Sequence, residues 1–227
     1  MPELASLTTH RRGFLGHIAA GAAALGLGGL IRPFAAAAET RDASAAPEFE
    51  AWLNKITGRH KMLFDVPEPN DGFAFAWTRV FLNTTNEAYG TKDADNSAVI
   101  VLRHSGIPFA MKDAMWAKYK FGQMFKITDP KTHRPAIRNP FVNMKPGDFP
   151  IAGVGVDELL AAGVLVGVCN IALTLTAGMV AKKLRKDGAA VKQEWVANLL
   201  PGVQIVPSGV IAVNRAQEKG CAYCFAG

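Results

Sequence analysis

From residue 48 onward, short apolar runs alternate with longer segments in which apolar residues are spaced three and four apart. Short β-branched runs bounded by Gly, Pro or polar residues are typical of buried strands, and the longer spacing is typical of helices. We therefore expect strands over 60–66, 97–104, 164–169, 203–206 and 221–225. We expect helices over 48–56, 72–89, 108–125, 157–162, 170–185, 190–200 and 208–219.

The alternation of strand and helix sets the fold class. Helical crossovers between buried strands predict a mostly parallel sheet covered on both faces, a three-layer α/β/α protein. Residues 58–227 are long enough for one domain with a single core. Residues 39–57 are expected to form a linker and a short N-terminal helix.

The uncharged stretch 159–181 has two interpretations. Its length and the Lys182-Lys183 pair that follows are typical of a membrane span. The second interpretation splits it into a short helix, a turn at Gly163, a strand ending at Cys169 and a helix capped by Asn170. The β-branched run before Cys169 and the strand–helix rhythm favour the split.

Residues 126–150 differ from the rest in holding five prolines and five basic residues. A loop of this length is unusual in a compact domain. It is either a functional or assembly surface, or an ordered surface excursion.

The N-terminus predicts an export signal. Arg11-Arg12 precedes an uncharged Ala/Gly-rich stretch, and Ala35–Ala38 offers small residues for a signal peptidase. We expect a twin-arginine signal over 1–38, export of the folded chain by the Tat machinery, and a periplasmic or otherwise extracytoplasmic location.

Charge and cysteine content narrow the partners. The formal net charge of +6 shrinks once the signal leaves, and no helix carries a basic stripe, so nucleic acid is not an expected partner. Three cysteines remain, which leaves at least one thiol unpaired within the chain.

Candidate site residues stand where the predicted strands end. In open α/β sheets, ligands bind at the carboxyl ends of strands. Asp65, His104 and Cys169 hold such positions, with Ser105 and Asn170 beside them. If the first strand lies between the second and third, these side chains surround one crevice, with His104 and Cys169 about two strand spacings apart.

Cys169 directly precedes a predicted helix. The amides and positive dipole of a helix start stabilise a thiolate and raise its reactivity. The alternative is a small apolar residue that fills the top of the core, since free cysteine is among the most buried residue types.

Cys221 and Cys224 form a CxxC pair within a predicted terminal strand. Residues three apart in a strand point to opposite faces, so a disulfide would require a turn. Without a second Cys/His pair zinc is not expected, and no phosphate loop or nucleophile elbow is present. We expect a structural role, with Cys224 the better placed of the two to approach Cys169, and neither a metal nor a cofactor.

Four segments carry a resemblance to a known family: Val99–Gly106, Gly163–Leu173, Leu199–Val203 and Ala216–Gly220. In their order, they resemble the DsrE/DsrF-like family of small α/β proteins linked to sulfur relay, over roughly 60–225. The resemblance implies a five-stranded flavodoxin-like sheet and a homo-oligomer, commonly a trimer or hexamer.

The resemblance also implies site residues. Cys169 matches the family's persulfide-carrying cysteine, and His104 is similar to a histidine often found after the second strand. The chain departs from the family in its export signal, its Pro-rich insert and its CxxC. We expect a carrier or binder of a small sulfur species on Cys169, with Asp65 and His104 polarising the pocket. The alternative is a non-catalytic oligomeric binding or structural module with Cys169 in its core.

Overall fold

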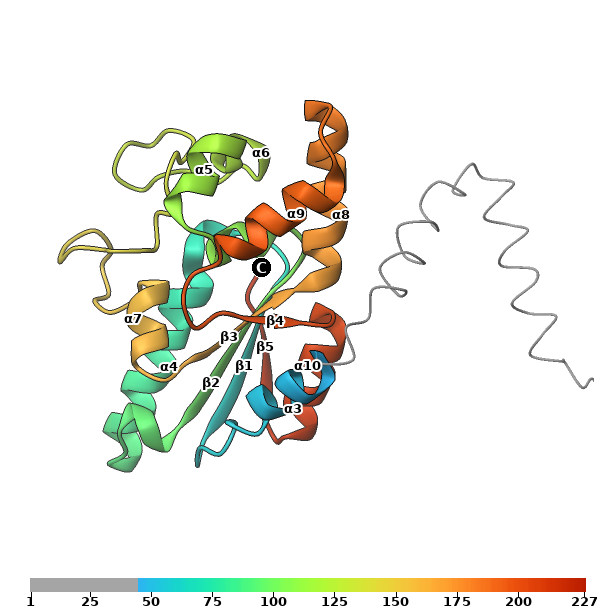
Figure 1. The fold of residues 1–227 in the computed structure, drawn as a ribbon. Coiled ribbons are helices and arrows are strands. Elements are labelled where there is room, and N and C mark those ends of the chain that lie inside the picture. The colour runs from blue at the N-terminus through green and yellow to red at the C-terminus, as the bar shows by residue number, and fades with distance from the viewer. Residues whose placement is uncertain (1–44) are drawn as a thin grey trace, which may run out of the picture. The chain divides into compact units, whose positions relative to one another are not determined.

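The computed structural model describes residues 45–227, which form a five-stranded sheet with helices on both faces (Figure 1). The predicted signal and cleavage site lie outside these residues. In chain order the elements are α3 (Ala45–Leu53), β1 (Lys61–Val66), η1 (Asn70–Gly72), α4 (Phe73–Tyr89), η2 (Asp93–Asp95), β2 (Ser97–Leu102), η3 (His104–Ala110), α5 (Asp113–Tyr119), α6 (Phe121–Met124), α7 (Val156–Ala161), β3 (Leu165–Cys169), α8 (Asn170–Leu184), α9 (Gly188–Ala197), β4 (Gln204–Val206), α10 (Gly209–Glu218) and β5 (Ala222–Phe225).

All strand pairs are parallel, and the strand order is β4-β3-β2-β1-β5. The central strand β2, Ser-Ala-Val-Ile-Val-Leu, is buried along its whole length, as a strand covered on both faces requires. The predicted three-layer, flavodoxin-like α/β class is confirmed.

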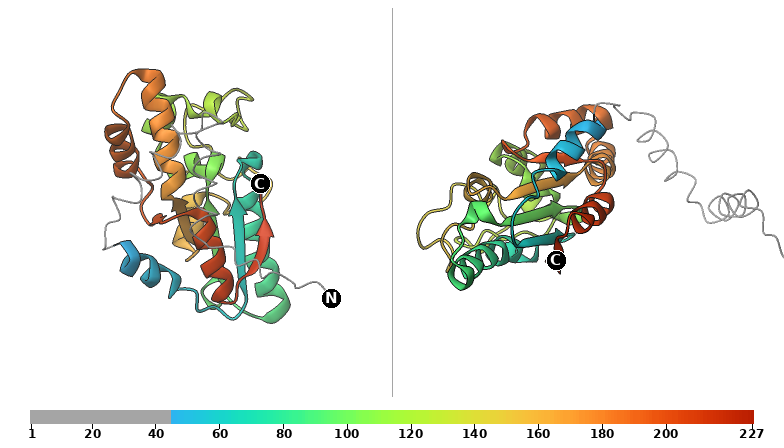
Figure 2. Two further views of the ribbon diagram at one scale, coloured as in Figure 1. Left: turned by 90° about the vertical axis from the view of Figure 1, so that its right-hand side faces the viewer. Right: turned by 90° about the horizontal axis from the view of Figure 1, so that it is seen from below.

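The strand order explains which helices share a face. From β1 to β4 the chain steps across the sheet in one direction, so right-handed crossovers place their helices on one face. From β4 to β5 it returns, which places α10 on the other face. Core contacts agree, because α4, α8 and α9 pack into one hydrophobic cluster and α3 and α10 into another. Figure 2 shows the helices on both sides of the sheet.

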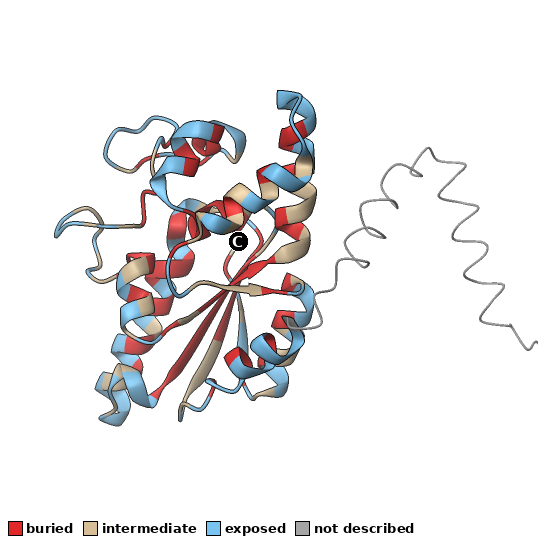
Figure 3. Cartoon of the chain, in the orientation of Figure 1, coloured by how far each residue is buried: buried red, intermediate tan, exposed pale blue. Residues whose placement is uncertain are grey.

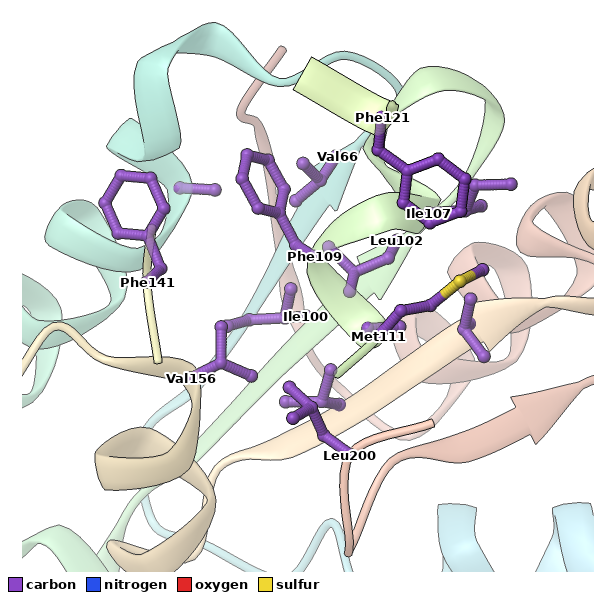
Figure 4. Close-up of a cluster of buried hydrophobic side chains, with 14 of the residues drawn as sticks. Val66, Ile100, Leu102, Ile107, Phe109, Met111, Phe121, Phe141, Val156 and Leu200 are labelled. Carbon is purple, nitrogen blue, oxygen red and sulfur yellow. The ribbon is translucent and has the colours of Figure 1, made fainter. Parts of the chain in front are cut away.

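The two clusters differ in content. The α4 face holds large aromatic side chains, among them Phe75, Phe109, Trp116, Phe121 and Trp195, none of them measurably exposed. The α10 face is thinner, and small residues such as Ala212 and Ala216 pack there against β2 and β3. Burial is concentrated along the strands and the inner helix faces (Figure 3), and Figure 4 shows part of the α4-face cluster.

The stretch 159–181 is split as the second interpretation expects. Helix α7 ends before a turn at Gly163, whose φ of 91° is favourable only for glycine, and β3 and α8 follow. Within residues 45–227 no helix is long and apolar enough to cross a membrane.

The expected helix over 108–125 is wrong in detail. In its place the structure has the 3-10 segment η3 and two short helices, α5 and α6. The two helices meet at Lys120, which has a φ of 52°. A residue in the left-handed region ends a helix, and the pattern of apolar residues does not reveal it.

The Pro-rich segment 126–150 is anchored to the α4 face. Asn139 is fully buried, and its side-chain amide donates to the carbonyls of Phe109 at 2.9 Å and Met111 at 3.0 Å. The ring of Phe141 lies among Phe75 and Phe109. The segment is therefore an ordered excursion that adds to the core, and a role as an assembly surface stays a prediction.

Candidate functional site

The strand order corrects the expected geometry at the carboxyl edge of the sheet. The first strand does not lie between the second and third; β2 lies between β1 and β3. Asp65 on β1 and Cys169 on β3 are thus about two strand spacings, or roughly 10 Å, apart. The end of β2 places Arg103, rather than His104, between them.

Arg103 forms a bidentate ion pair with Asp65. Its Nε donates to Asp65 Oδ1 at 2.6 Å and its Nη2 donates to Oδ2 at 2.8 Å. The Asp65 side chain is only 3% exposed and that of Arg103 is 30% exposed. A buried carboxylate requires a charged partner with this geometry, so the pair fixes the guanidinium firmly.

The backbone explains why Arg103 faces Asp65. Arg103 is extended, with φ −137° and ψ 170°, and its amide continues the β1–β2 ladder by donating to Val66 O at 3.0 Å. Side chains alternate along a strand, so Arg103 shares the α10 face with Val101. Val101 is the register partner of Asp65, which brings the two charged groups together.

Tyr223 on β5 completes the polar cluster. Its hydroxyl donates to Asp65 Oδ2 at 2.8 Å. Burial and this hydrogen bond raise the pKa of Tyr223 above its ordinary value, so the phenol remains a donor at neutral pH. Asp65, Arg103 and Tyr223 come from β1, the end of β2, and β5, and the cluster lies at the carboxyl edge of the sheet, where open α/β sheets bind ligands.

Cys169 caps α8. Its Sγ accepts a hydrogen bond from the backbone N–H of Ala172 at 3.3 Å, which is the interaction of an N-cap side chain. The prediction that Asn170 is the cap is wrong, because Asn170 is the first helical residue. Cys169 is 6% exposed.

Arg103 and Cys169 are neighbours across β2 and β3. Leu102 pairs with Val168, and Arg103 and Cys169 are the residues that follow them, so their backbones are adjacent. The Cys169 side chain packs in the α4-face cluster. The hydrogen bond to Asp65 raises the pKa of Arg103 most, and smaller electrostatic contributions from Asp65, Tyr223 and Cys169 raise it further against the effect of burial.

The start of α10 closes the cluster from one side. A Cβ on Gly209 would lie 2.7 Å from both Cβ and Cδ of Arg103, so only glycine lets the helix approach this closely. Ser208 caps α10 by accepting from the Ile211 N–H at 3.2 Å, and α10 contacts α8. The arrangement therefore brings the helix start into contact with the aliphatic part of the Arg103 side chain.

His104 and Ser105 occupy the rim. His104 is exposed with a φ of 47°, and its Nδ1 lies 3.0 Å from Ser105 Oγ. The Ser105 amide donates to Pro67 O at 2.8 Å. The structure thus brings Asp65, Arg103 and Cys169 into one row and leaves His104 on the solvent side of the next turn.

The CxxC cysteines lie away from Cys169. Cys221 packs in the α10-face cluster and Cys224 against the α4-face cluster, so they point to opposite faces as expected. Strand β5 is separated from β3 by β1 and β2, so Cys224 is about three strand spacings from Cys169. At this separation Cys224 does not contact Cys169, and all three thiols are free. Of the two, Cys224 packs against the cluster that contains Cys169 and Cys221 does not.

Other candidate sites are weaker. No group of three or more metal-binding side chains occurs in residues 45–227. A surface cavity of about 730 Å³ opens at the amino ends of the strands, where Lys55, Asp157 and mostly apolar residues line it. It is at the opposite edge of the sheet from Cys169 and holds neither a nucleophile nor a paired acid and base.

Sequence reasoning missed Arg103, Tyr223 and Gly209. The alternation of β2 would have placed Arg103 on the α10 face, but its partner follows only from the strand order. No protein-family model matches the chain, and no curated protein matches it significantly in sequence.

Proposed function

We propose that this protein binds or carries a sulfur species on Cys169. The observation that carries the proposal is the position of Cys169 Sγ at the start of α8, hydrogen-bonded to the Ala172 amide and next to Arg103. Helix-start amides and a neighbouring cation both stabilise the thiolate, which is the reactive form.

The chemistry needs no cofactor. The Cys169 thiolate attacks the outer sulfur of a sulfane donor, a new S–S bond forms at cysteine, and the donor's S–S bond breaks. With thiosulfate, sulfite leaves with the bonding electron pair, and the total charge is unchanged. The product is a persulfide on Cys169.

The test is the intact mass of the protein after exposure to thiosulfate or polysulfide. We expect a mass increase of one sulfur atom on wild type and none on Cys169→Ser. An equal increase on Cys169→Ser would overturn the proposal.

Cys221 provides a matched control because it is also 6% exposed. Burial raises the pKa of Cys221, and Cys221 lies outside the start of a helix. We expect Cys169 to react with a thiol reagent in the native state well before Cys221. If both react only after unfolding, Cys169 is a core residue and the protein is a binding or structural module.

The proposal includes export and self-association. Export by the Tat machinery to the periplasm is supported by Arg11-Arg12 and the sequence that follows. A homo-oligomer is supported by the exposed aromatic residues of the edge strand β5, Tyr223 and Phe225. Cell fractionation and light scattering of the processed protein test these two points.

A further inference from the structure

The two charges of the Asp65–Arg103 ion pair lie at different distances from Cys169. The carboxylate is buried on β1, whereas the guanidinium is partly exposed and belongs to a residue at the end of β2, the strand between β1 and β3. The charge of Cys169 contributes to the raised pKa of Arg103, so the two groups interact electrostatically. Although the pair is neutral as a whole, its positive end is nearer to Cys169 than its negative end. An oriented pair of this kind favours negative charge at the place that its positive end faces.

Part of the guanidinium remains available to a ligand. Asp65 takes hydrogen bonds from Nε and Nη2, and within the described residues no acceptor is found for the N–H groups of Nη1. Arginine binds planar or trigonal oxyanions through two adjacent N–H groups. The start of α10, at Gly209, lies against the same side chain and adds helix-start polarity.

We propose that Arg103 is a specificity-determining residue, which Asp65 and Tyr223 hold in place so that Cys169 reacts preferentially with anionic reagents of the thiosulfate type. The inference rests on the proposed function, since it names the donor class for the same thiol. In the transfer step Arg103 donates hydrogen bonds to the oxygens of the departing sulfite. Asp65 is a positioning residue that bonds Arg103, and Tyr223 positions Arg103 through its hydrogen bond to Asp65; neither touches the donor.

The test compares two alkylating reagents of nearly equal shape, the anion iodoacetate and the neutral iodoacetamide. The protein carries Cys221→Ser and Cys224→Ser, so that Cys169 is its only thiol. The measured quantity is the ratio of the iodoacetate rate to the iodoacetamide rate. Access and thiolate content affect both rates alike, so the ratio reports the charge that the reagent meets.

The two charged residues should shift this ratio in opposite directions. We expect Arg103→Gln to lower it roughly fivefold, the effect of one unit charge a few Å away near water. Asp65→Asn should raise it about twofold, because it removes a more distant negative charge while the amide oxygen still accepts a hydrogen bond from Arg103 and keeps it in place. A merely structural role would change both rates together and leave the ratio constant, and a constant ratio in both variants overturns the inference.

Two further variants keep the test decisive. Arg103→Gln leaves the buried Asp65 carboxylate unpaired, and this variant could fail to fold for that reason. The double variant Asp65→Asn/Arg103→Gln removes both charges and therefore avoids the unpaired carboxylate. Its ratio should still fall below wild type, because the nearer charge is lost. Arg215→Gln, on α10 and paired with the exposed Glu50 and Glu218, should leave the ratio unchanged.

The readouts separate the two proposals. A shifted ratio without a persulfide after thiosulfate treatment would support the anion preference and refute the sulfur carrier. A persulfide on wild type that forms equally fast on Arg103→Gln would support the carrier and refute the role of Arg103.

Discussion

The two faces of the sheet differ in what covers them. On the α4 face, aromatic rings pack edge to face: Phe109 lies 5.1 Å from Phe75 and 5.5 Å from Phe141 between ring centroids. On the α10 face, helices α3 and α10 cover a smaller cluster. Tyr223 and Phe225 of β5 remain exposed there, with Asp65 and Arg103 at the carboxyl edge.

The two faces therefore contribute differently to the stability of the fold and to the candidate site. The α4 face supplies most of the apolar burial that stabilises the fold. The α10 face leaves room at the carboxyl edge of the sheet for charged groups, and Asp65 and Arg103 hold each other in place there through hydrogen bonds. Stability and site chemistry should therefore respond to substitutions on different faces.

The largest expected effect is the loss in the free energy of unfolding when a buried tryptophan is replaced, and it should differ between the two faces. Trp116 on the α4 face is fully buried, contacts Phe109 and Phe121, and donates its indole N–H to Met111 O at 3.3 Å. Trp52 on the other face packs over Gly167, and its buried indole N–H has no acceptor among the described residues. We expect Trp116→Ala to lower the free energy of unfolding by about 5 kcal/mol and Trp52→Ala by about 3 kcal/mol.

Denaturant unfolding at constant m-value measures both losses. The smaller loss at Trp52 follows because its removal also eliminates an unpaired buried donor. Equal losses, or a larger loss at Trp52, would contradict the contrast between the faces.

The next effect tests the approach of α10 to Arg103. Gly209→Ala should cost about 2 kcal/mol, because the new Cβ would meet Arg103 Cβ and Cδ at 2.7 Å. It should also move the iodoacetate-to-iodoacetamide ratio, since the guanidinium must shift. Gly178→Ala on α8 is the matched control: no atom lies within 4 Å of its added Cβ, so it should stabilise by about 0.5–1 kcal/mol. A harmless Gly209→Ala would show that the helix start does not hold Arg103.

The two faces also differ in how far sequence reasoning reaches. Strand and helix positions follow from periodicity, because β2 and β3 are short β-branched runs and α4 and α10 are amphipathic. The breaks at Lys120 and within 104–110 depend on backbone conformations that apolar spacing does not encode. Anchoring of the Pro-rich segment through Asn139 depends on tertiary hydrogen bonds.

Site prediction failed at one specific step. Cys169 and Asp65 could be recognised as strand-end residues from the sequence alone. The row Asp65–Arg103–Cys169 required the order of strands, and the sequence allows more than one order. His104 drew attention as a titratable residue, whereas the adjacent Arg103 makes the contact with Asp65 because alternation turns it toward the α10 face.

The smallest expected effect concerns the polar contacts between α5 and α9 on the α4 face. Glu194 of α9 pairs with Lys118 and accepts a hydrogen bond from the Tyr119 hydroxyl at 2.7 Å, both on α5. The hydrogen bonds from Lys118 and Tyr119 lower the pKa of Glu194 below its ordinary value of 4.5. Stability from this group is therefore complete above pH 4.5 and is lost as the pH falls through the lowered pKa of the folded state.

Glu194→Gln should flatten this acid dependence, and the difference at neutral pH should be only about 0.5 kcal/mol because the ion pair is partly exposed. Tyr119→Phe provides the complementary control. Burial and the bond to Glu194 raise the pKa of Tyr119 from 10.0 to about 12, so its stabilising contribution is present below pH 10 and decreases above it. Tyr119→Phe should remove that alkaline loss while the Lys118 pairing keeps part of the acid dependence. If stability depends on acid pH identically in wild type and Glu194→Gln, the polar contacts between α5 and α9 contribute nothing to stability. The α4 face would then be held by apolar packing alone.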